Sequence, residues 1–358
     1  MEAVNTRLVA DIGGTKARLA LVDGPTGPGG AWTMRSHLVL RCSDYDSLEG
    51  VIERYLEQIA PLRPLRACLA VAGPVNDDVV RMTNRSWQFS AATLQSRYGF
   101  QQLEIINDVA ALAYGTAFAP PDAIRTIKQG IVIGRHARVA VALGTGVGIA
   151  ALRREGSGWR PAPGEGGHTG LSPVTALERE LHRRLGGERE HVSWEAVLSG
   201  AGLVRLHRVL AEVEGRAVPD MKEAAIIARC RAGDAAALKT VSQFSIFLGA
   251  LAGDAVLAAG ALSGAYLGGG LLFALESFID YESLVTRFCL KGAMSELMRQ
   301  VPIFSLDSEH WLLIGAAAWL DVAAPAAWSA ASSSTKQGNL IICLPETTNL
   351  RPGTMIQA

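Results

Sequence analysis

Three glycine clusters have the composition of phosphate-binding loops. They are Gly13-Gly14-Thr15, Gly144-Thr145-Gly146 and Gly268-Gly269, and each directly follows an apolar segment typical of a strand. Because glycine has no Cβ, backbone N–H groups in such turns can approach phosphate oxygens closely. One such cluster is equally typical of an ordinary tight turn. Three of them, each after an apolar strand, indicate a ligand site, because α/β sheets bind ligands at the ends of their strands.

Two acidic positions lie beside these predicted strand ends. Asp11 precedes the first glycine cluster and could hold a water molecule of a hydrated magnesium ion. Asn107 and Asp108 follow an apolar segment at 103–106. A carboxylate at such a position can accept a proton from an attacking hydroxyl group, which the amide can orient. The alternative is that Asn107 and Asp108 only cap a helix that begins near Val109.

A second polar group occurs further along the chain. Glu165 and His168 stand three residues apart in a glycine-rich segment, and both can form hydrogen bonds to sugar hydroxyls. A metal site would need further ligands, which the neighbouring sequence does not offer, and the alternative is a plain surface loop. Glu195 follows Ser193, the predicted N-cap of a short helix. Its alternative role is to complement the helix dipole.

The elements that must position these residues alternate between strands and helices. Apolar runs predict strands at 7–12, 17–22, 67–72, 103–106, 138–143 and 149–153. Helical spacing predicts helices at 48–59, capped by Asp44 or Asp46, at 109–117, over most of 193–259, and at 314–321. A strand, a glycine turn and a second strand occur at both 7–22 and 138–153, which predicts a duplicated α/β architecture.

The composition excludes several classes of protein. The chain has 358 residues, enough for about two domains, and its 34 basic and 34 acidic residues cancel. Nucleic acids and anionic membranes need a cationic surface, so neither is the expected partner. The 5 cysteines form no C-x-x-C pair, which favours reduced thiols, and no signal peptide is apparent. The uncharged stretch 255–275 is expected to be a buried helix end, a buried strand and a glycine loop.

Taken together, the motifs resemble those of the bacterial glucokinases, in the ATP-dependent hexokinase branch of the actin-like ATPase superfamily. The resemblance runs in order from Leu8 to about Leu320. Its pieces are Asp11-Ile-Gly-Gly-Thr15, Ala72-Gly-Pro74, Met82-Thr-Asn84, Glu104-Ile-Ile-Asn-Asp108, Leu143-Gly-Thr-Gly146, Pro163-Gly-Glu-Gly-Gly-His168, His191-Val-Ser-Trp-Glu195, Leu198-Ser-Gly200 and Leu267-Gly-Gly-Gly270. Val109 departs from the family, in which an aromatic residue often follows the catalytic Asp.

The resemblance implies an α/β fold of two ribonuclease-H-like (actin-like ATPase) domains flanking a central cleft. The smaller domain would comprise residues 1–118 plus about 309–323 and the larger one 119–308. The remainder, 324–358, is expected to be an atypical, disordered tail. The implied activity is transfer of the γ-phosphoryl group of ATP to the 6-hydroxyl of D-glucose, the first step of glycolysis.

The resemblance also assigns roles to individual residues. Asp108 is implied as the catalytic base and as a glucose ligand. The other implied glucose ligands are Asn107, Glu165, His168 and Glu195. The implied nucleotide-binding residues are Ala10, Asp11, Ile12, Gly13, Gly14, Thr15, Gly144, Thr145, Gly146, Gly268 and Gly269. Magnesium is expected to arrive with ATP and not in a separate protein metal site. A cytoplasmic homodimer is the expected form, with no nucleic-acid or membrane partner.

Two other function classes share parts of this pattern. A sugar-responsive transcriptional regulator would need a DNA-binding helix-turn-helix before the first strand, where only about six residues stand, and a basic surface. An actin-like or chaperone-like ATPase would use the glycine loops but has no need for Glu165 and His168 as sugar ligands. ATP turnover that does not depend on glucose would favour the ATPase.

Overall fold

The fold is described from a computed structural model of the chain. The described residues are 6–24, 31–73, 75, 79–82, 85–132, 134–156, 158–187, 191–217, 219–306 and 308–322. All of these residues belong to Met1–Val322, the larger of the two units into which the chain divides. The tail predicted at 324–358 lies outside the described residues.

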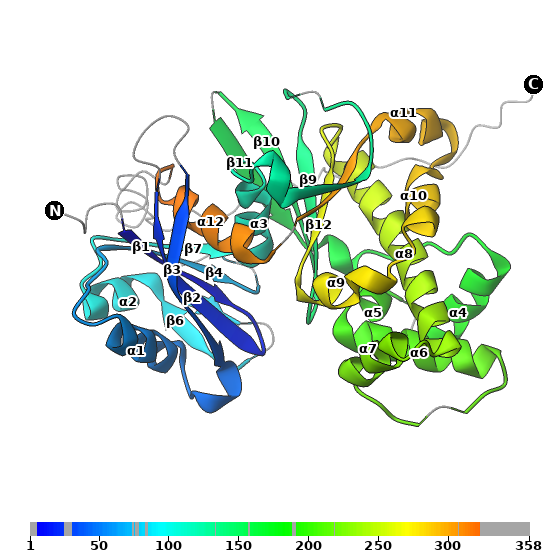
Figure 1. The fold of residues 1–358 in the computed structure, drawn as a ribbon, viewed down its shortest axis with the longest axis horizontal. Coiled ribbons are helices and arrows are strands. Elements are labelled where there is room, and N and C mark those ends of the chain that lie inside the picture. The colour runs from blue at the N-terminus through cyan, green and yellow to red at the C-terminus, as the bar shows by residue number, and fades with distance from the viewer. Residues whose placement is uncertain are drawn as a thin grey trace, which may run out of the picture. The chain divides into compact units, whose positions relative to one another are not determined.

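Two sheets of similar topology form the framework of the larger unit (Figure 1). The first has the strand order β3 (Thr33–Arg41), β2 (Lys16–Asp23), β1 (Thr6–Ile12), β4 (Arg66–Val71), β7 (Gln102–Asn107). The second has the order β11 (Gly158–Gly164), β10 (Val147–Glu155), β9 (Arg138–Leu143), β12 (Ala265–Gly268), β13 (Ile303–Leu306), β8 (Ile124–Lys128). A small sheet pairs β5 (Val79–Arg81) with β6 (Gln88–Ser90).

The two larger sheets repeat one pattern, as the sequence predicts. Strands β1, β4 and β7 run parallel to one another, with β2 and β3 added antiparallel. Strands β9, β12 and β13 are likewise parallel, with β10 and β11 added antiparallel. The predicted strands agree with the observed ones to within two residues. The edge strand β3 was not predicted, because most of its residues are exposed and it lacks a buried apolar run.

The first two glycine clusters are the tips of tight hairpins. Ile12 pairs with Ala17 at the end of the β1–β2 hairpin, and Gly13 donates a hydrogen bond to the Lys16 carbonyl. Leu143 pairs with Val147 at the end of the β9–β10 hairpin. Both tips therefore lie at the carboxyl ends of the parallel strands, where the sequence analysis places them.

Twelve α-helices and five short 3₁₀ segments occur among the described residues. The α-helices are α1 (Leu48–Ile59), α2 (Ala91–Tyr98), α3 (Asp108–Gly115), α4 (Ala176–Gly186), α5 (Glu195–Leu198), α6 (Gly200–Val213), α7 (Glu223–Arg231), α8 (Ala235–Ala259), α9 (Gly270–Leu275), α10 (Tyr281–Cys289), α11 (Ser295–Gln300) and α12 (His310–Trp319). The 3₁₀ segments are η1 (Cys42–Asp44), η2 (Pro121–Ala123), η3 (Gly166–His168), η4 (Glu276–Phe278) and η5 (Gly292–Met294).

Two of the predicted helix caps are wrong. The side chain of Ser47, and not that of Asp44 or Asp46, accepts the capping hydrogen bond of α1 from Gly50. Trp194 occupies the N-cap position of α5 without a side-chain hydrogen bond, so Ser193 is not the cap. Helix α12 also begins at His310, before the predicted start at 314, because the apolar pattern alone does not mark its first turn.

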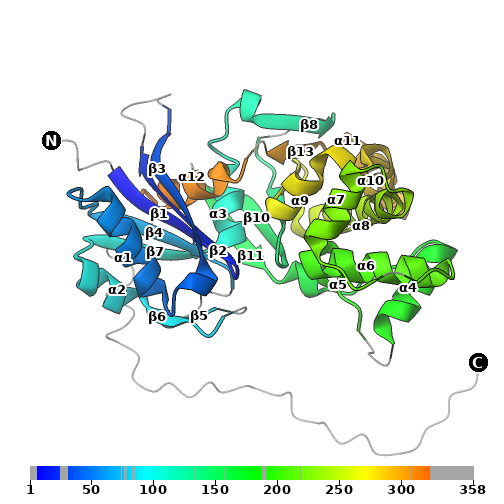
Figure 2. The same ribbon diagram turned by 60° about the horizontal axis from the view of Figure 1, so that its bottom comes forward.

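Helices α3 and α12 pack closely against each other in both views of the fold (Figures 1 and 2). Gly115 and Gly315 permit this contact, because a Cβ at either position would overlap the backbone of the opposite helix. Helix α12 also contacts β1 and β4, and the buried Arg7 donates a hydrogen bond of 3.0 Å to its Ala317 carbonyl. These contacts fix α3, and with it Asp108, against the first sheet.

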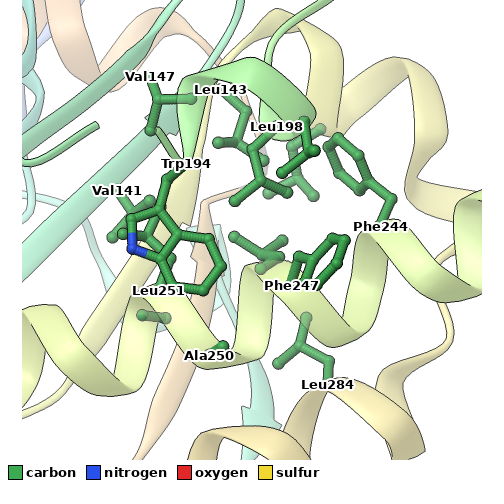
Figure 3. Close-up of a cluster of buried hydrophobic side chains, with 14 of the residues drawn as sticks. Val141, Leu143, Val147, Trp194, Leu198, Phe244, Phe247, Ala250, Leu251 and Leu284 are labelled. Atoms are coloured by element: carbon green, nitrogen blue, oxygen red, sulfur yellow. The ribbon is translucent and has the colours of Figure 1, made fainter. Parts of the chain in front are cut away.

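The largest hydrophobic core lies beneath the second hairpin (Figure 3). Leu143 and Val147, which flank Gly144–Gly146, point into it together with Trp194, which precedes Glu195. Helix α8 contributes Phe244 and Phe247 to the same core. This packing fixes both the hairpin tip and the start of α5.

Helix α8 is long and apolar enough to cross a membrane by length and composition, and 72% of its most apolar window is buried in the fold. The described chain from 255 to 275 contains the end of α8, the buried strand β12 and the glycine turn before α9. This agrees with the prediction of a core segment.

Candidate active site

Asp108 stands where β7 ends and α3 begins. Its Oδ1 accepts a hydrogen bond of 2.8 Å from the N–H of Val109. The neighbouring Asn107 is the N-cap of α3, since its Oδ1 accepts a hydrogen bond of 3.0 Å from Ala110. Its Nδ2 donates to the Gly73 carbonyl at 3.1 Å. Capping, the alternative role for this pair, is thus a real function of Asn107, while the carboxyl group of Asp108 accepts hydrogen bonds from two backbone N–H groups, that of Val109 and its own.

The surroundings of Asp108 favour its protonated form. Burial raises the pKa of this carboxyl to about 7, and the negative charge of Asp11 adds to the effect. Two backbone N–H groups oppose the rise and Glu165 contributes weakly to it. A carboxyl group with a pKa near neutrality is well matched to proton transfer in water near pH 7.

Asp11 lies at the end of β1 and is itself buried. Its Oδ2 accepts a hydrogen bond of 2.8 Å from Arg18, its cross-strand partner in the β1–β2 hairpin. Burial raises the pKa of Asp11 to about 6, and Arg18 limits this rise. The other branch of the Arg18 guanidinium pairs with Glu309 at 2.5 Å. The sequence analysis missed Arg18 and Glu309, although the register of so short a hairpin places residues 11 and 18 opposite each other.

The side chain of Glu195 stabilises the tip of the second hairpin. Its Oε2 accepts a hydrogen bond of 2.9 Å from the N–H of Val147, and a Cβ added at Gly146 would lie only 2.6 Å from the same oxygen. Glycine at 146 therefore makes room for the carboxylate. Glu195 is the first residue of α5, so its charge also complements that helix terminus.

The third glycine cluster packs against the second. Gly269 has φ +100°, a conformation that favours glycine, and a Cβ there would overlap the backbone of Leu143, which precedes Gly144. A Cβ on Gly270 would lie 2.7 Å from Oε1 of Glu309, the partner of Arg18. Gly268–Gly270 are thus adjacent to the second hairpin and, through Glu309, to the first.

Glu165 and His168 lie together on the exposed segment around η3. Glu165 Oε2 and His168 Nε2 are 3.9 Å apart, with side chains 67% and 58% exposed. The segment packs on β10, because a Cβ at Gly166 would touch Ile149 and one at Gly167 would overlap Val147. Both side chains are open to solvent, and the charge of Glu165 contributes to the raised pKa of Asp108.

Close contacts connect α3 with the second sheet. A Cβ on Gly148, in β10, would lie 3.0 Å from the Cβ of Val109, the residue after Asp108. A Cβ on Gly268 would lie 3.3 Å from Leu112, one turn further along α3. Asp108, both hairpin tips and the third glycine cluster are therefore brought to one place, although they are far apart in the sequence.

Arg85 is a further residue that the sequence analysis did not select. Its guanidinium donates a hydrogen bond of 3.2 Å to the carbonyl of Gly14 and lies 4.6 Å from the ring centre of Trp87. This hydrogen bond therefore stabilises the tip of the first hairpin. Asn84, in the same motif, lies outside the described residues.

The residues at the two hairpin tips have the chemistry of a phosphate-binding site. Within the described parts of the chain, no group of three His, Cys, Asp or Glu side chains could hold a metal ion. Two glycine hairpin tips offer backbone N–H groups without obstructing Cβ atoms, and the carboxylate of Asp11 stands at the base of the first tip. This donor set suits phosphate oxygens and the hydration shell of Mg²⁺.

Comparisons with known proteins identify the family of the chain. A sequence model of the family described as Glucokinase matches residues 8–323. The chain belongs to the glucokinase family. A glucokinase from Saccharophagus degradans is 39% identical over 318 residues, covering 88% of this chain and 98% of its own. One from Chromohalobacter salexigens is 35% identical, with coverage of 86% and 95%.

Solved structures show the same architecture. The crystal structure of a glucokinase from an Antarctic psychrotroph is similar with a TM-score of 0.78 and 36% identity, covering 89% of this chain and 99% of that one. A Streptomyces griseus ROK-family glucokinase in complex with glucose and AMPPNP has a TM-score of 0.61 at 20% identity, covering 88% and 98%, which shows the fold alone. The predicted family, the actin-like ATPase fold and glucokinase activity are confirmed by these comparisons.

Proposed function

We propose that this enzyme transfers the γ-phosphoryl group of ATP to the 6-hydroxyl of D-glucose, with Asp108 as the general base. The observation that carries the proposal is the position of Asp108. Its carboxyl group lies near Asp11 at the base of the first hairpin, and the following Val109 packs against Gly148 of the second. Burial and Asp11 raise its pKa to about 7. The group can therefore accept the hydroxyl proton and release it again near neutral pH.

Phosphoryl transfer depends more on the position of the attacking hydroxyl group than on the strength of the base. Phosphoryl transfer passes through a loose transition state, so the attacking hydroxyl needs little nucleophilic strength and can lose its proton late. Asp108 then orients the hydroxyl and accepts that proton on its carboxylate. General-base assistance of this kind contributes about 10² to 10⁴ in rate.

Glucose would be held by the polar side chains around Asp108. We assign Asn107, Glu165, His168 and Glu195 as sugar ligands alongside Asp108. Glu165 and His168 are exposed and 3.9 Å apart. Sugar binding would therefore cover them, and closing the site over the sugar would exclude water, the competing acceptor. For this closure we propose two lobes, residues 1–118 with about 309–323, and 119–308.

The nucleotide phosphates would lie on the glycine hairpins. We assign the first loop to Ala10, Asp11, Ile12, Gly13, Gly14 and Thr15, the second to Gly144, Thr145 and Gly146, and the adenosine side to Gly268 and Gly269. Asp11 would hold a water molecule of the magnesium ion that accompanies ATP. That ion supplies positive charge to the phosphates. Arg18, paired with Asp11 at 2.8 Å, keeps the carboxylate oriented.

We further propose that the enzyme works in the cytoplasm as a homodimer. The formal charge of zero argues against nucleic acid or an anionic membrane as its partner. The specificity for one hexose depends on how many of its hydroxyl groups the site recognises. A sugar that lacks one of these hydroxyls leaves a buried polar group of the enzyme without a hydrogen-bond partner, and is therefore rejected strongly.

The test is a coupled assay of glucose 6-phosphate formation with purified full-length chain. Glucose, mannose, glucosamine and fructose are compared as acceptors, and ATP, ADP and polyphosphate as donors. We expect the highest kcat/KM for glucose with ATP. ATP hydrolysis that is independent of any sugar would contradict the proposal and would favour a shape-changing ATPase of the same fold.

A further inference from the structure

Glu223 lies against the second phosphate loop. It is the first residue of α7, and its carboxylate occupies the space that a Cβ on Gly200 would need. Gly200 begins α6, and its N–H donates a hydrogen bond of 3.0 Å to the carbonyl of Gly144. A single residue thus separates the Glu223 carboxylate from the loop assigned to the nucleotide phosphates.

Lys16, which follows the first phosphate loop, lies within electrostatic reach of the same carboxylate. Burial raises the pKa of Glu223, and the positive charge of Lys16 partly offsets this effect. Lys16 directly follows Gly13-Gly14-Thr15 and is exposed. Glu223 is therefore close to both loops, although it comes from a helix that the resemblance to glucokinases did not single out.

The Glu223 carboxylate is half-buried and forms no hydrogen bond or ion pair with any residue that the structure describes. Removing part of a carboxylate from water without giving it a hydrogen-bond donor costs free energy. Lys16 and the N-terminus of α7 complement the charge of Glu223, but neither supplies a hydrogen-bond donor to its carboxylate. The position is therefore ready for a ligand that brings hydrogen-bond donors.

The chemistry of ATP limits which part of it can be that ligand. Phosphates are anionic and would be repelled by a carboxylate. The ribose carries two neighbouring hydroxyl groups, whose O–H donors match the two oxygens of a carboxylate, a pairing used for ribose in other nucleotide sites. The ribose is also bonded directly to the phosphates, whereas adenine is one unit further from the two loops that Glu223 approaches.

We propose that Glu223 binds the nucleotide ribose by accepting hydrogen bonds from its 2′- and 3′-hydroxyls. This inference rests on the proposed function, because it takes the glycine hairpins as the phosphate site. It adds a nucleotide-binding residue from α7 to the three loops.

The test compares two nucleotides in three proteins. KM and kcat are measured at saturating glucose with ATP and with 2′,3′-dideoxy-ATP, for the wild type, Glu223→Gln and Glu282→Gln. Glutamine keeps the size of the side chain but removes its charge. Glu282 is a matched control, because it also lies in the first turn of a helix and is exposed.

For Glu223→Gln we expect KM for ATP to rise about ten- to a hundredfold, the range for a lost hydrogen bond to a charged group, with kcat and KM for glucose unchanged. KM for dideoxy-ATP should be the same in the variant and the wild type, because that nucleotide has no ribose hydroxyls that could form hydrogen bonds with Glu223. Glu282→Gln should behave as wild type throughout. Calorimetric titration with ADP and 2′,3′-dideoxy-ADP should show the same difference without turnover.

Two results would overturn the inference. One is an equal rise of KM for both nucleotides, which would mean that Glu223 acts through Lys16 or the loop. The other is an unchanged KM for ATP. Failure of the proposed function has a different outcome, because the wild type would then form no glucose 6-phosphate with either nucleotide.

Discussion

The strongest prediction concerns the proton of Asp108. A base with a pKa of about 7 is about 9% ionised at pH 6 and about 91% ionised at pH 8. We therefore expect kcat/KM for glucose to fall about tenfold from pH 8 to pH 6. An unperturbed aspartate, with a pKa near 3.9, would give almost no change over this range.

The Asp108→Asn variant separates the base from the binding group. Asparagine can still accept the hydrogen bond from the Val109 N–H, so the start of α3 is retained. We expect kcat to fall by about 10² to 10⁴, the usual worth of a general base, with glucose affinity within about tenfold. The tenfold pH dependence should disappear. Asp122→Asn, in an exposed turn, is the control carboxylate.

The thermal stability of Asp108→Asn provides a second test of the raised pKa. Because the pKa of Asp108 is raised from 3.8 to about 7, the folded state holds this proton more tightly than the unfolded state does. Its contribution to stability is present at low pH and is lost as pH rises toward 7. The loss is at most about 4 kcal/mol, and less because Asp108 keeps some exposure to solvent. The Tm of Asp108→Asn should therefore equal that of wild type at pH 4 and exceed it at pH 8.

Differential scanning fluorimetry and the coupled assay, run on the same preparations from pH 4 to pH 9, measure both effects. Near-normal turnover in Asp108→Asn would remove Asp108 from the role of base. A pH profile that is flat between 6 and 8 in the wild type would contradict the argument that burial and Asp11 raise the pKa of the catalytic group.

Three further changes test the loops. Gly146→Ala should lower Tm and raise KM for glucose, because its Cβ would displace the Glu195 carboxylate, whereas Gly144→Ala has open space and should leave Tm unchanged. Gly269→Ala should lower Tm by several degrees through its φ of +100° and the overlap with Leu143, as measured by scanning calorimetry against wild type. Arg18→Gln removes the charge that limits the pKa of Asp11, so the acidic limb of kcat/KM for ATP should move to higher pH, an effect that the exposed Arg97→Gln should not show.

Much of the framework could be predicted from local sequence. Short apolar runs such as 138–143, with two valines and a glycine cluster directly after them, favour a buried strand that ends in a tight turn. The repetition of this unit predicted the duplicated sheets. Exposed edges such as Thr33–Arg41 carry no apolar signal, because their stability comes from pairing with a neighbouring strand.

Local sequence likewise predicts some residues of the candidate site and not others. Asp11, Asp108 and the hairpin glycines follow from their place at strand ends. Glu223 and Glu309 do not, because each matters only through a contact with a residue far away in the sequence, Gly200 in one case and Arg18 in the other. No spacing rule within one element connects such pairs, so three-dimensional packing has to be known first.

The raised pKa of Asp108 also depends on the three-dimensional arrangement of the strands. Asp108 and Asp11 are 97 residues apart, from the difference of their numbers, yet the charge of Asp11 contributes to the raised pKa of Asp108. The contact exists because β1 and β7 are parallel neighbours of β4 and end at the same edge of one sheet. A sequence can place a carboxylate at each strand end, but only the strand order decides whether the two charges meet. In this fold they do, and the resulting proton affinity suits a base that works near neutral pH.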